Sequence, residues 1–525
     1  MLTVDHLIIG AGSAGCVLAN RLSAEPRRRV LLLEAGGADS SPYIRMPAGL
    51  ARLVHDRRLN WGYRTEPEPA LNGRRLWWPR GRVLGGSSSI NAMCYIRGQR
   101  EDYDGWAAAG CDGWSYAEVL PYFRRAEDQE RGADEFHGSG GPLAVSDLRY
   151  RSAPSAAFIA AAIAAGFPAN PDFNGAQQLG VGWYQVTQRR GRRWSAADAY
   201  LRPALSRPNL TVLTDALATR LSFEGSRVTG AEYLKDGALA QITAGAVTLA
   251  GGAINTPQLL LLSGIGAADE LERHGLAVRL ELPGVGANLQ DHLDYCTLYR
   301  SRRTDTYDYS RLGEAWVGLR YWLTGGGPGS SNLAECGGFV RSGLARDARP
   351  DLQLHFVPAQ LDDHGRHRLK DHGFTVHGCG LRPRSRGRIR LRSGDPTAAP
   401  LIEAGYLSAP EDAQLLIEAI RVARRIVAAA PLDPWRGPEL YPGAAEDSDA
   451  ALLAAIRAKA ETLYHPVGSC RMGNDAAAVV DARLRVRGAD GLSIADASVM
   501  PALVSGNTNA PTMMIAERAA EWLGA

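Results

Sequence analysis

The chain has 525 residues, of which 45% are hydrophobic and 22% charged, and its formal net charge is +3. This length suffices for a large buried core in more than one domain, and the absence of a basic run argues against a dedicated nucleic-acid-binding protein. Seven cysteines lie far apart in the sequence without a CxxC pair, which favours reduced thiols over a disulfide framework or a zinc site.

We expect no targeting segment ahead of the fold. A strand-like run begins at residue 4, which leaves no room for a signal peptide, so the cytoplasm is the expected compartment. Residues 247–266 form a long apolar stretch, but Gly251-Gly252 and Thr256-Pro257 interrupt it. These breaks favour a strand, a turn and a helix over a membrane span, and no distinct amphipathic segment suggests membrane association. We therefore expect no transmembrane segment.

Residues 4–36 have the pattern of a dinucleotide-binding unit. An apolar strand is followed by a glycine-rich turn, a helical run and a second buried strand that ends at Glu34. In such a turn Gly10 permits the tight bend, Gly12 lets the backbone approach a pyrophosphate, and Gly15 lets the helix pack closely on the strand. Glu34 is expected to accept hydrogen bonds from a ribose diol. The motif alone does not distinguish FAD from NAD.

A long irregular connection follows at residues 37–80, and loops of this length tend to cover a site. The next stretch, residues 81–91, combines a Gly-Gly pair, three serines and Asn91. Its backbone and side-chain donors could bind an anion or a polar ring edge, although a flexible linker is the alternative interpretation.

Further strands continue the same sheet. Residues 209–214 predict a strand that leads to Ala218, and residues 247–250 predict a buried strand followed by a glycine turn. Asn255 or Thr256 is the expected N-cap of the next helix, with Pro257 as its first residue.

Two other regions, residues 145–195 and 296–455, have a different character. Alternating patterns at residues 351–356 and 387–392 predict strands, and residues 413–429 predict an amphipathic helix. Loops 296–330 and 358–372 are too irregular to assign. We predict an α/β fold with a doubly wound, Rossmann-like FAD-binding or NAD-binding domain (1–144, 196–295 and 456–525) and a discontinuous substrate domain of antiparallel sheet plus helices (145–195 and 296–455), with a cavity at their junction.

His465 is the main candidate for catalysis. Pro466 keeps its backbone out of a helix, so the ring can point into a cavity. A lone histidine is more often structural, but a strand at 492–496, a polar loop at 506–512 and a helix N-terminus direct their dipoles to one point. This convergence favours a functional role.

Several long motifs together resemble the glucose-methanol-choline oxidoreductases, a family of FAD enzymes. They are residues 81–104, 252–266, 284–292 and the C-terminal segment from Tyr464, in addition to the N-terminal turn, so the resemblance covers nearly the whole chain. It implies FAD in place of NAD. Together with the glycine turn it implies a flavin site formed by Gly10, Gly12, Ser13, Ala14, Gly15, Glu34, Ala35, Val83, Gly86, Ser87, Asn91, Ala92, Met93, Cys94, Ala218, Asp496, Ala497, Asn507, Pro511 and Thr512.

The resemblance also implies a reaction. His465 and Asn509 match the catalytic pair of the family, in which many relatives have a second histidine at the position of Asn509. His465 would take the proton of an alcohol, Asn509 would hold the alcohol oxygen, and the hydride would go to flavin N5. The substrate is expected to be a small, primary alcohol and the electron acceptor O2 or a quinone. Some relatives attach FAD through a histidine where this chain has Ile90, so we expect non-covalent FAD.

Three alternatives remain open at this stage. A few relatives are hydroxynitrile lyases that keep FAD without redox chemistry. Asp362, Asp363, His364, His367, His372 and His377 could be metal ligands, but their surroundings favour a solvated loop and we expect no metal. Glu335 could recognise a cationic substrate in the cavity, although a structural hydrogen-bonding role is favoured.

Overall fold

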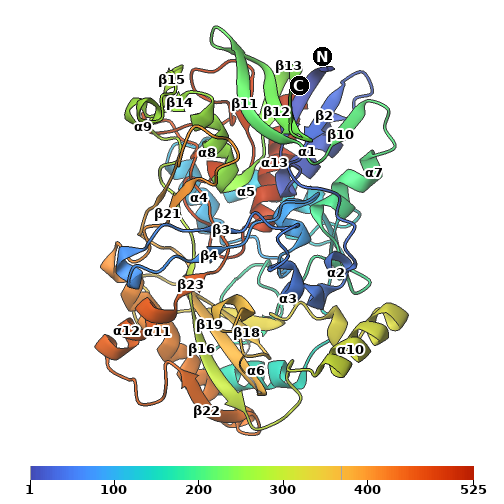
Figure 1. The fold of residues 1–525 in the computed structure, drawn as a ribbon. Helices are drawn as coiled ribbons and strands as arrows, with labels where there is room; N and C mark the ends of the chain where they lie inside the picture. Colours follow the sequence, from blue (N-terminus) through green and yellow to red (C-terminus); the bar gives the residue numbers. More distant parts are fainter. Residues whose placement is uncertain (1, 368, 370, 525) are drawn as a thin grey trace.

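Two seven-stranded sheets, one above the other in the view of Figure 1, organise the part of the chain that is described. The computed structural model describes residues 2–367, 369 and 371–524. No helix among these residues is long and apolar enough to cross a membrane.

The upper sheet has a parallel centre. Its order is β10 (Leu210–Leu213), β2 (Val30–Leu33), β1 (Leu2–Ile9), β13 (Ala238–Leu249) and β24 (Leu492–Ile494). β13 pairs with β24 at its C-terminal end, and near its start it pairs with the antiparallel hairpin of β12 (Arg227–Lys235) and β11 (Leu217–Glu224). The short strands are almost entirely apolar because parallel strands are covered on both faces. Helices α1 (Ser13–Leu22) and α13 (Asn509–Gly524) pack on each other beside this sheet.

The lower sheet is antiparallel, in the order β22 (Arg436–Tyr441), β16 (Leu293–Ser301), β19 (Gly373–Gly380), β18 (Leu352–Val357), β17 (Cys336–Val340) and β7 (Gly180–Trp183), and β23 (Glu461–Thr462) also pairs with β16. Helices α6 (Ala153–Ala164) and α11 (Pro410–Val427) bury one face of the sheet with Phe158, Phe356 and Phe374 in a common core. The alternate residues of these strands point to the opposite face of the sheet, away from α6 and α11.

The remaining helices and strands lie outside the two sheets. Many of them lie in the irregular connection and in the loops around the sheets: α2 (Pro42–Arg45), α3 (Leu50–Leu53), β3 (Tyr63–Arg64), β4 (Trp77–Trp78), α4 (Arg100–Ala108), α5 (Tyr116–Ala126), β5 (Glu127–Gln129), β6 (Leu143–Val145), β8 (Gln188–Arg189), β9 (Arg192–Arg193), α7 (Arg202–Ala204), β14 (Ile265–Gly266), α9 (Ala268–Arg273), β15 (Leu280–Glu281), α10 (Arg311–Thr324), β20 (Arg388–Arg390), β21 (Leu401–Glu403) and α12 (Asp449–Lys459).

The predicted α/β fold with an antiparallel second sheet is confirmed, as are the strands predicted at 209–214 and 351–356 and the amphipathic helix, which is α11. The strand predicted within 387–392 forms a separate hairpin, β20–β21, next to α8 (Gly252–Leu262). The division of the chain into two domains at the stated boundaries stays a prediction.

The predicted start of α8 was wrong. The helix begins at Gly252, so Pro257 lies inside it and cannot donate to the carbonyl of Ala253, four residues earlier. The Ser469 hydroxyl donates to that carbonyl oxygen at 2.5 Å instead. A side chain from a distant loop therefore replaces the hydrogen bond that proline removes.

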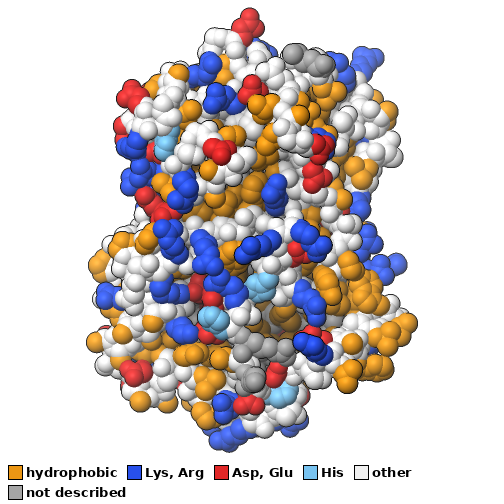
Figure 2. Space-filling model, in the orientation of Figure 1, with side chains coloured by type: hydrophobic (Ala, Val, Ile, Leu, Met, Phe, Trp, Pro, Cys, Tyr) orange, Lys and Arg blue, Asp and Glu red, His pale blue; other side chains and the backbone are white. Residues whose placement is uncertain are grey.

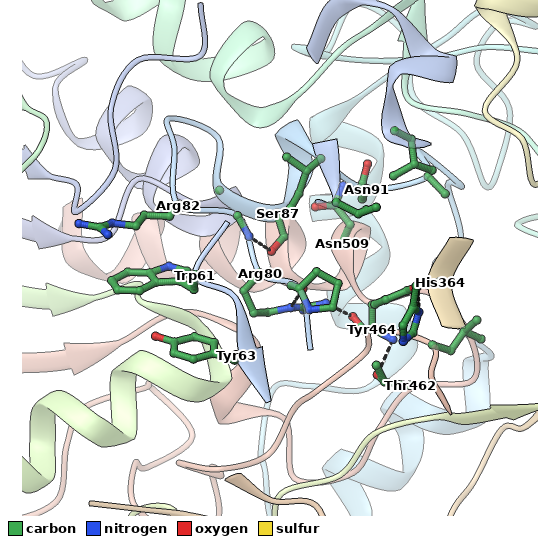
Figure 3. Close-up of a pocket in the computed structure, with 18 of the residues that line it drawn as sticks. Trp61, Tyr63, Arg80, Arg82, Ser87, Asn91, His364, Thr462, Tyr464 and Asn509 are labelled. Atoms are coloured by element: carbon green, nitrogen blue, oxygen red, sulfur yellow. Dashed lines mark hydrogen bonds between the residues drawn. The ribbon is translucent and has the colours of Figure 1, made fainter. Parts of the chain in front are cut away.

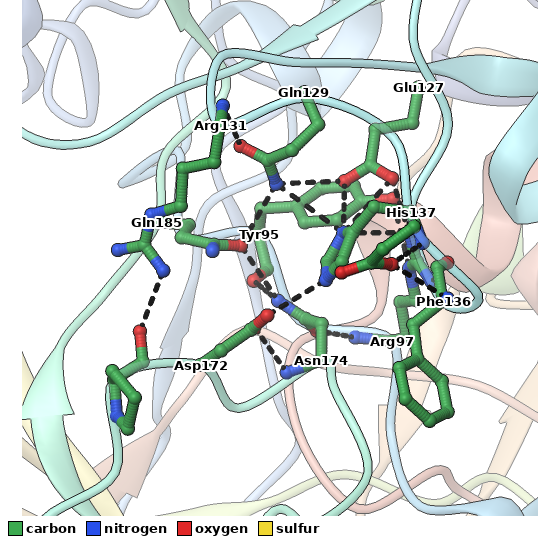
Figure 4. Close-up of polar contacts among 12 residues, drawn as sticks. Tyr95, Arg97, Glu127, Gln129, Arg131, Phe136, His137, Asp172, Asn174 and Gln185 are labelled. Atoms are coloured by element: carbon green, nitrogen blue, oxygen red, sulfur yellow. Dashed lines mark hydrogen bonds and ion pairs between the residues drawn. The ribbon is translucent and has the colours of Figure 1, made fainter.

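A buried ion-pair network joins the loops beside the two sheets (Figure 4). Arg97 pairs with Glu127, which also accepts from His137 Nδ1 at 3.1 Å, and His137 Nε2 donates to Asp172 at 2.8 Å. Burial alone would lower the pKa of His137, but the hydrogen bonds to Asp172 and Glu127 outweigh it and raise the pKa to about 9. His137 is therefore a cation at neutral pH.

Candidate active site

A cavity of about 1370 Å³ lies between the two sheets. Its wall includes the C-terminal ends of parallel strands, at Ile9, Leu33 and Leu249, which is where open α/β sheets bind ligands. Residues of the irregular connection, among them Trp61 and Tyr63, also line it, as expected for a covering loop (Figure 3). The volume exceeds that of an ordinary small-molecule pocket and suits a dinucleotide with a small substrate.

The glycine turn has the geometry that a dinucleotide site requires. Gly10 has a φ of +104°, and a side chain there would place its Cβ 2.6 Å from the Ala250 carbonyl oxygen. A Cβ at Gly15 would lie 1.8 Å from the carbonyl oxygen of Gly10, so only glycine lets α1 pack this closely on β1. The turn thus leaves the start of α1 open to the cavity.

Glu34 lies at the end of β2, buried and on the cavity wall. Its carboxylate accepts hydrogen bonds from the backbone N–H groups of Ala11 and Gly36, both at 2.8 Å. Burial raises the pKa of Glu34 to about 7 in spite of these donors. The remaining lone pairs of the carboxylate are available to a hydroxyl-bearing ligand.

The loop at residues 81–91 closes over the glycine turn. Gly85 N–H donates to the Ala11 carbonyl at 2.8 Å, and Asn91 accepts from Met93 N at 3.0 Å and from Arg193 at 2.8 Å. Ser87 and Asn91 line the cavity near Asn509 (Figure 3). The flexible-linker interpretation is therefore wrong, because these hydrogen bonds hold the loop in place.

His465 belongs to a directional chain of hydrogen bonds. His292 Nε2 lies 3.0 Å from the Leu381 carbonyl oxygen, which only accepts, so this nitrogen carries the proton and His292 Nδ1 is an acceptor. His465 Nδ1 donates to His292 Nδ1 at 2.9 Å, and consequently Nε2 of neutral His465 carries no proton and has a lone pair that can accept a hydrogen bond. Burial, followed by the neighbouring His292 and His355 rings, holds the pKa of His465 well below its ordinary value.

The residue that meets this lone pair is Asn507. Its Nδ2 donates to His465 Nε2 at 3.1 Å, and its Oδ1 accepts from Gln353 at 3.1 Å. Asn509 is the first residue of α13, and its Oδ1 accepts from Ser13 Oγ at 2.7 Å, next to the glycine turn. Both asparagines line the cavity; Asn507 is the one that hydrogen-bonds to His465, and the catalytic role predicted for Asn509 stays a prediction.

The backbone around His465 is held from several sides. Asp291 accepts from His465 N–H at 2.7 Å and from the Thr462 hydroxyl at 2.5 Å, and burial raises its pKa to about 6. Arg80 donates to the Tyr464 carbonyl at 2.8 Å (Figure 3). His465 itself lies outside any helix, as the following Pro466 predicts.

The floor of the cavity is the face of the lower sheet opposite α6 and α11, which sequence reasoning missed. Asp294 and Cys296 on β16, His377 on β19 and His355 on β18 all line the cavity. Cys296 faces His377 across one strand pair, and His377 faces His355 across the next. The signal was present as polar residues at alternate positions of otherwise apolar strands.

Most of the predicted flavin-site residues line the cavity, namely Gly10, Gly12, Ser13, Ala14, Glu34, Ala35, Gly86, Ser87, Asn91, Ala92, Met93, Cys94, Ala218, Asp496, Ala497, Asn507 and Thr512. Three do not. Gly15 packs on the Gly10 carbonyl, Val83 lies in a small core with Ile44 and Ile90, and Pro511 is buried in the first turn of α13.

The other candidates have structural partners. Glu335 is fully buried away from the cavity wall and accepts from Ser152 Oγ at 2.6 Å and Ser331 Oγ at 2.7 Å, so it holds loops together and does not face a substrate. His364 bonds to Tyr464 and to Glu461, the latter at 3.0 Å. His377 lies 2.5 Å from Asp294, and with Cys296 the two could hold a metal ion in geometric terms.

Comparison with known proteins shows extensive similarity. Two models of the GMC oxidoreductase family match residues 4–294 and 383–516. The alcohol dehydrogenase [acceptor] of Pseudomonas putida is 50% identical over 98% of this chain and 95% of its own length. The mitochondrial choline dehydrogenase of Homo sapiens is 47% identical over 98% of this chain and 89% of its own.

Solved structures share the fold. Pyridoxine 4-oxidase from Mesorbium loti superposes with a TM-score of 0.91 at 34% identity, over 99% of each chain. The FAD-containing formate oxidase of Aspergillus oryzae, at 26% identity, has a TM-score of 0.93 over 99% of this chain and 98% of its own.

Proposed function

Because this chain belongs to the GMC oxidoreductase family, a family of FAD-binding flavoproteins, we propose that it oxidises a small primary alcohol to the aldehyde with non-covalent FAD as cofactor and His465 as the general base. The observation that carries the proposal is the chain of hydrogen bonds that makes Nε2 the unprotonated nitrogen of neutral His465, on the cavity wall beside Asn507.

The donors and acceptors of the cavity fit FAD. The free N–H groups at the start of α1 suit a pyrophosphate, and the carboxylate of Glu34 suits a ribose diol. The side chain at position 90, Ile90, cannot form a bond to the cofactor, which supports non-covalent binding. When bound, FAD supplies the hydride acceptor for the reaction.

The residues of the chain handle the proton. His465 is neutral at ordinary pH because its pKa is depressed, so Nε2 can accept the hydroxyl proton of an alcohol. Asn507 lies beside this nitrogen, and its amide N–H can donate to the alcohol oxygen as negative charge develops there. Asn509 also lines the cavity, so we propose that Asn507 shares with Asn509 the task of holding the alcohol oxygen.

The relatives suggest the substrate class. One is named for alcohol and another for choline, which supports a small alcohol held above the polar floor of the lower sheet. Both named relatives are dehydrogenases, so the hydroxynitrile lyase alternative is not favoured. The identity of the acceptor, O2 or a quinone, and the cytoplasmic compartment stay predictions.

The test is an oxygen-free visible spectrum of the purified holoprotein during addition of choline, benzyl alcohol, hydroxymethylfurfural or octanol. We expect one of these alcohols to bleach the flavin bands, and His465→Ala to lower the rate of bleaching at least a hundredfold while FAD stays bound. The matched control is His274→Ala, since His274 lies outside the cavity wall and pairs with Glu270.

Admission of air then distinguishes O2 from another electron acceptor. Rapid recovery of the flavin colour with formation of peroxide indicates an oxidase, and slow recovery indicates a dehydrogenase. A His465→Ala protein that bleaches at the wild-type rate would overturn the assignment of the base. If no alcohol of the panel bleaches the flavin, a cyanohydrin cleavage assay tests the lyase reaction next.

A further inference from the structure

Helix α10 presents an apolar stripe to solvent. Leu312, Trp316, Leu319 and Leu323 are 84%, 64%, 51% and 75% exposed. At 100° per residue these four side chains fall within an arc of about 60° on the helix. In Figure 2 they form the hydrophobic patch at the lower right, where α10 projects from the body in Figure 1.

The one buried side chain of the helix lies on the side opposite the stripe. Tyr321 is its one buried residue among those described, and the Tyr321 hydroxyl donates to the Arg45 carbonyl at 2.9 Å. A surface helix of a globular protein normally turns its apolar stripe towards the core. Here the apolar stripe points outward, which marks an interaction surface.

Arginines surround the stripe. Arg311 and Arg320 lie on the two flanks of the helix, and both are exposed. The β8–β9 turn, with exposed Arg190 and Arg192, packs against the end of α10, where a Cβ on Gly191 would lie 2.3 Å from the Gly325 carbonyl oxygen. Exposed leucine and tryptophan bordered by arginine are typical of a helix that lies in the headgroup region of an anionic bilayer.

A second copy of the chain fits this surface less well. A symmetric dimer through α10 would bring the arginines of both copies together at one interface, where their like charges repel. An anionic lipid surface neutralises the same charges and accepts the apolar stripe.

The stripe also borders the cavity. Val317 and Trp322 of α10 line the cavity wall on the inner side of the helix, and Tyr43 and Leu50 line it from the neighbouring α2 and α3. The stripe residues themselves do not belong to this wall among the described residues. The inner side of α10 and its two neighbouring helices therefore form part of the cavity wall next to the proposed lipid surface.

We propose that α10 is an interfacial membrane anchor, which lies in the plane of an anionic lipid bilayer with Leu312, Trp316, Leu319 and Leu323 inserted and places this side of the cavity wall next to the membrane surface. The anchor is independent of the reaction proposed above, since none of the four residues lines the site.

The experiment is flotation of the full-length holoprotein with vesicles of phosphatidylcholine containing 30% phosphatidylglycerol, and with vesicles of phosphatidylcholine alone. We expect binding to the anionic vesicles, weakened at least tenfold by Trp316→Ser with Leu319→Ser. Leu239 and Leu344 are 68% and 48% exposed on other surfaces, so Leu239→Ser with Leu344→Ser is the matched control and should bind as the wild type does. Arg190→Ser with Arg192→Ser should reduce the preference for anionic vesicles.

Two outcomes overturn the proposal. The first is a wild-type protein that does not float with either kind of vesicle. The second is sedimentation of a lipid-free dimer that Trp316→Ser with Leu319→Ser converts to monomer, which would show that a second copy covers the stripe. Alcohol-driven bleaching of the flavin, measured on the same preparations, reports separately on the reaction.

Discussion

The distance of a side chain from the start of α13 decides which of two asparagines reaches His465. Asn509 begins the helix and is drawn to Ser13, whereas Asn507 lies two residues earlier on the loop and meets the imidazole. The sequence Asn-Thr-Asn offers both, and a resemblance cannot separate them without the position of the helix. The structure is needed to tell them apart, because both residues are asparagines and only the course of the backbone sends one side chain to His465 and the other to Ser13.

We expect Asn507→Ala and Asn509→Ala to have different effects. Removal of the Asn507 amide deprives the alcohol oxygen of a donor, so flavin reduction in a single turnover of FAD-saturated enzyme should slow at least tenfold. Asn509→Ala frees Ser13 beside the pyrophosphate site, so it should weaken FAD binding to the apoprotein and slow the reduction of saturated enzyme less than Asn507→Ala does. A slower reduction in Asn509→Ala than in Asn507→Ala would show that Asn509, and not Asn507, holds the alcohol oxygen.

At the scale of elements, apolar runs and glycine turns were sufficient to predict the central strands and α1, because parallel strands need continuous apolar residues and the turn needs glycine. Two of the helices that were missed or misplaced show why these patterns do not suffice elsewhere. α10 lies in a loop region that looked irregular, since its apolar residues face solvent and not a core. α8 starts earlier than Pro257 suggests because Ser469 supplies a hydrogen bond from outside the helix.

This substitute hydrogen bond can be tested by a double-mutant cycle. Ser469→Ala leaves the buried Ala253 carbonyl without a donor and should lower the free energy of unfolding by about 1–3 kcal/mol. In a Pro257→Ala background the new backbone N–H can donate to the same carbonyl, so Ser469→Ala should cost at least about 1 kcal/mol less. Urea unfolding with excess FAD measures both; an equal cost in the two backgrounds would contradict the explanation.

At the scale of the whole molecule, the buried network of Arg97, Glu127, His137 and Asp172 links loops of the two sheets (Figure 4). None of it was apparent from the sequence, because the four residues are spread over 75 positions and only folding brings them together. The same holds for the cavity floor, where strand pairing decides which polar side chains become neighbours.

The network makes stability depend on pH. The pKa of His137 is raised from 6.5 to about 9 in the folded chain, so its contribution is complete below pH 6.5 and is lost as the pH rises through 9. We expect the difference in unfolding free energy between wild type and His137→Gln to shrink by roughly 2–3 kcal/mol between pH 6 and pH 10. Urea titrations at both pH values measure it, and a difference that does not change with pH would exclude a charged His137.

The hydrogen bonds from Asn507 through His465 and His292 to Leu381 end at a peptide carbonyl, which cannot take up a proton. This chain of hydrogen bonds therefore cannot carry a proton from His465 into the protein interior. The proton must return through the cavity, which the product also leaves. Departure of the product and regeneration of the free base are thus coupled events, and the slower of the two sets the interval before another substrate can react.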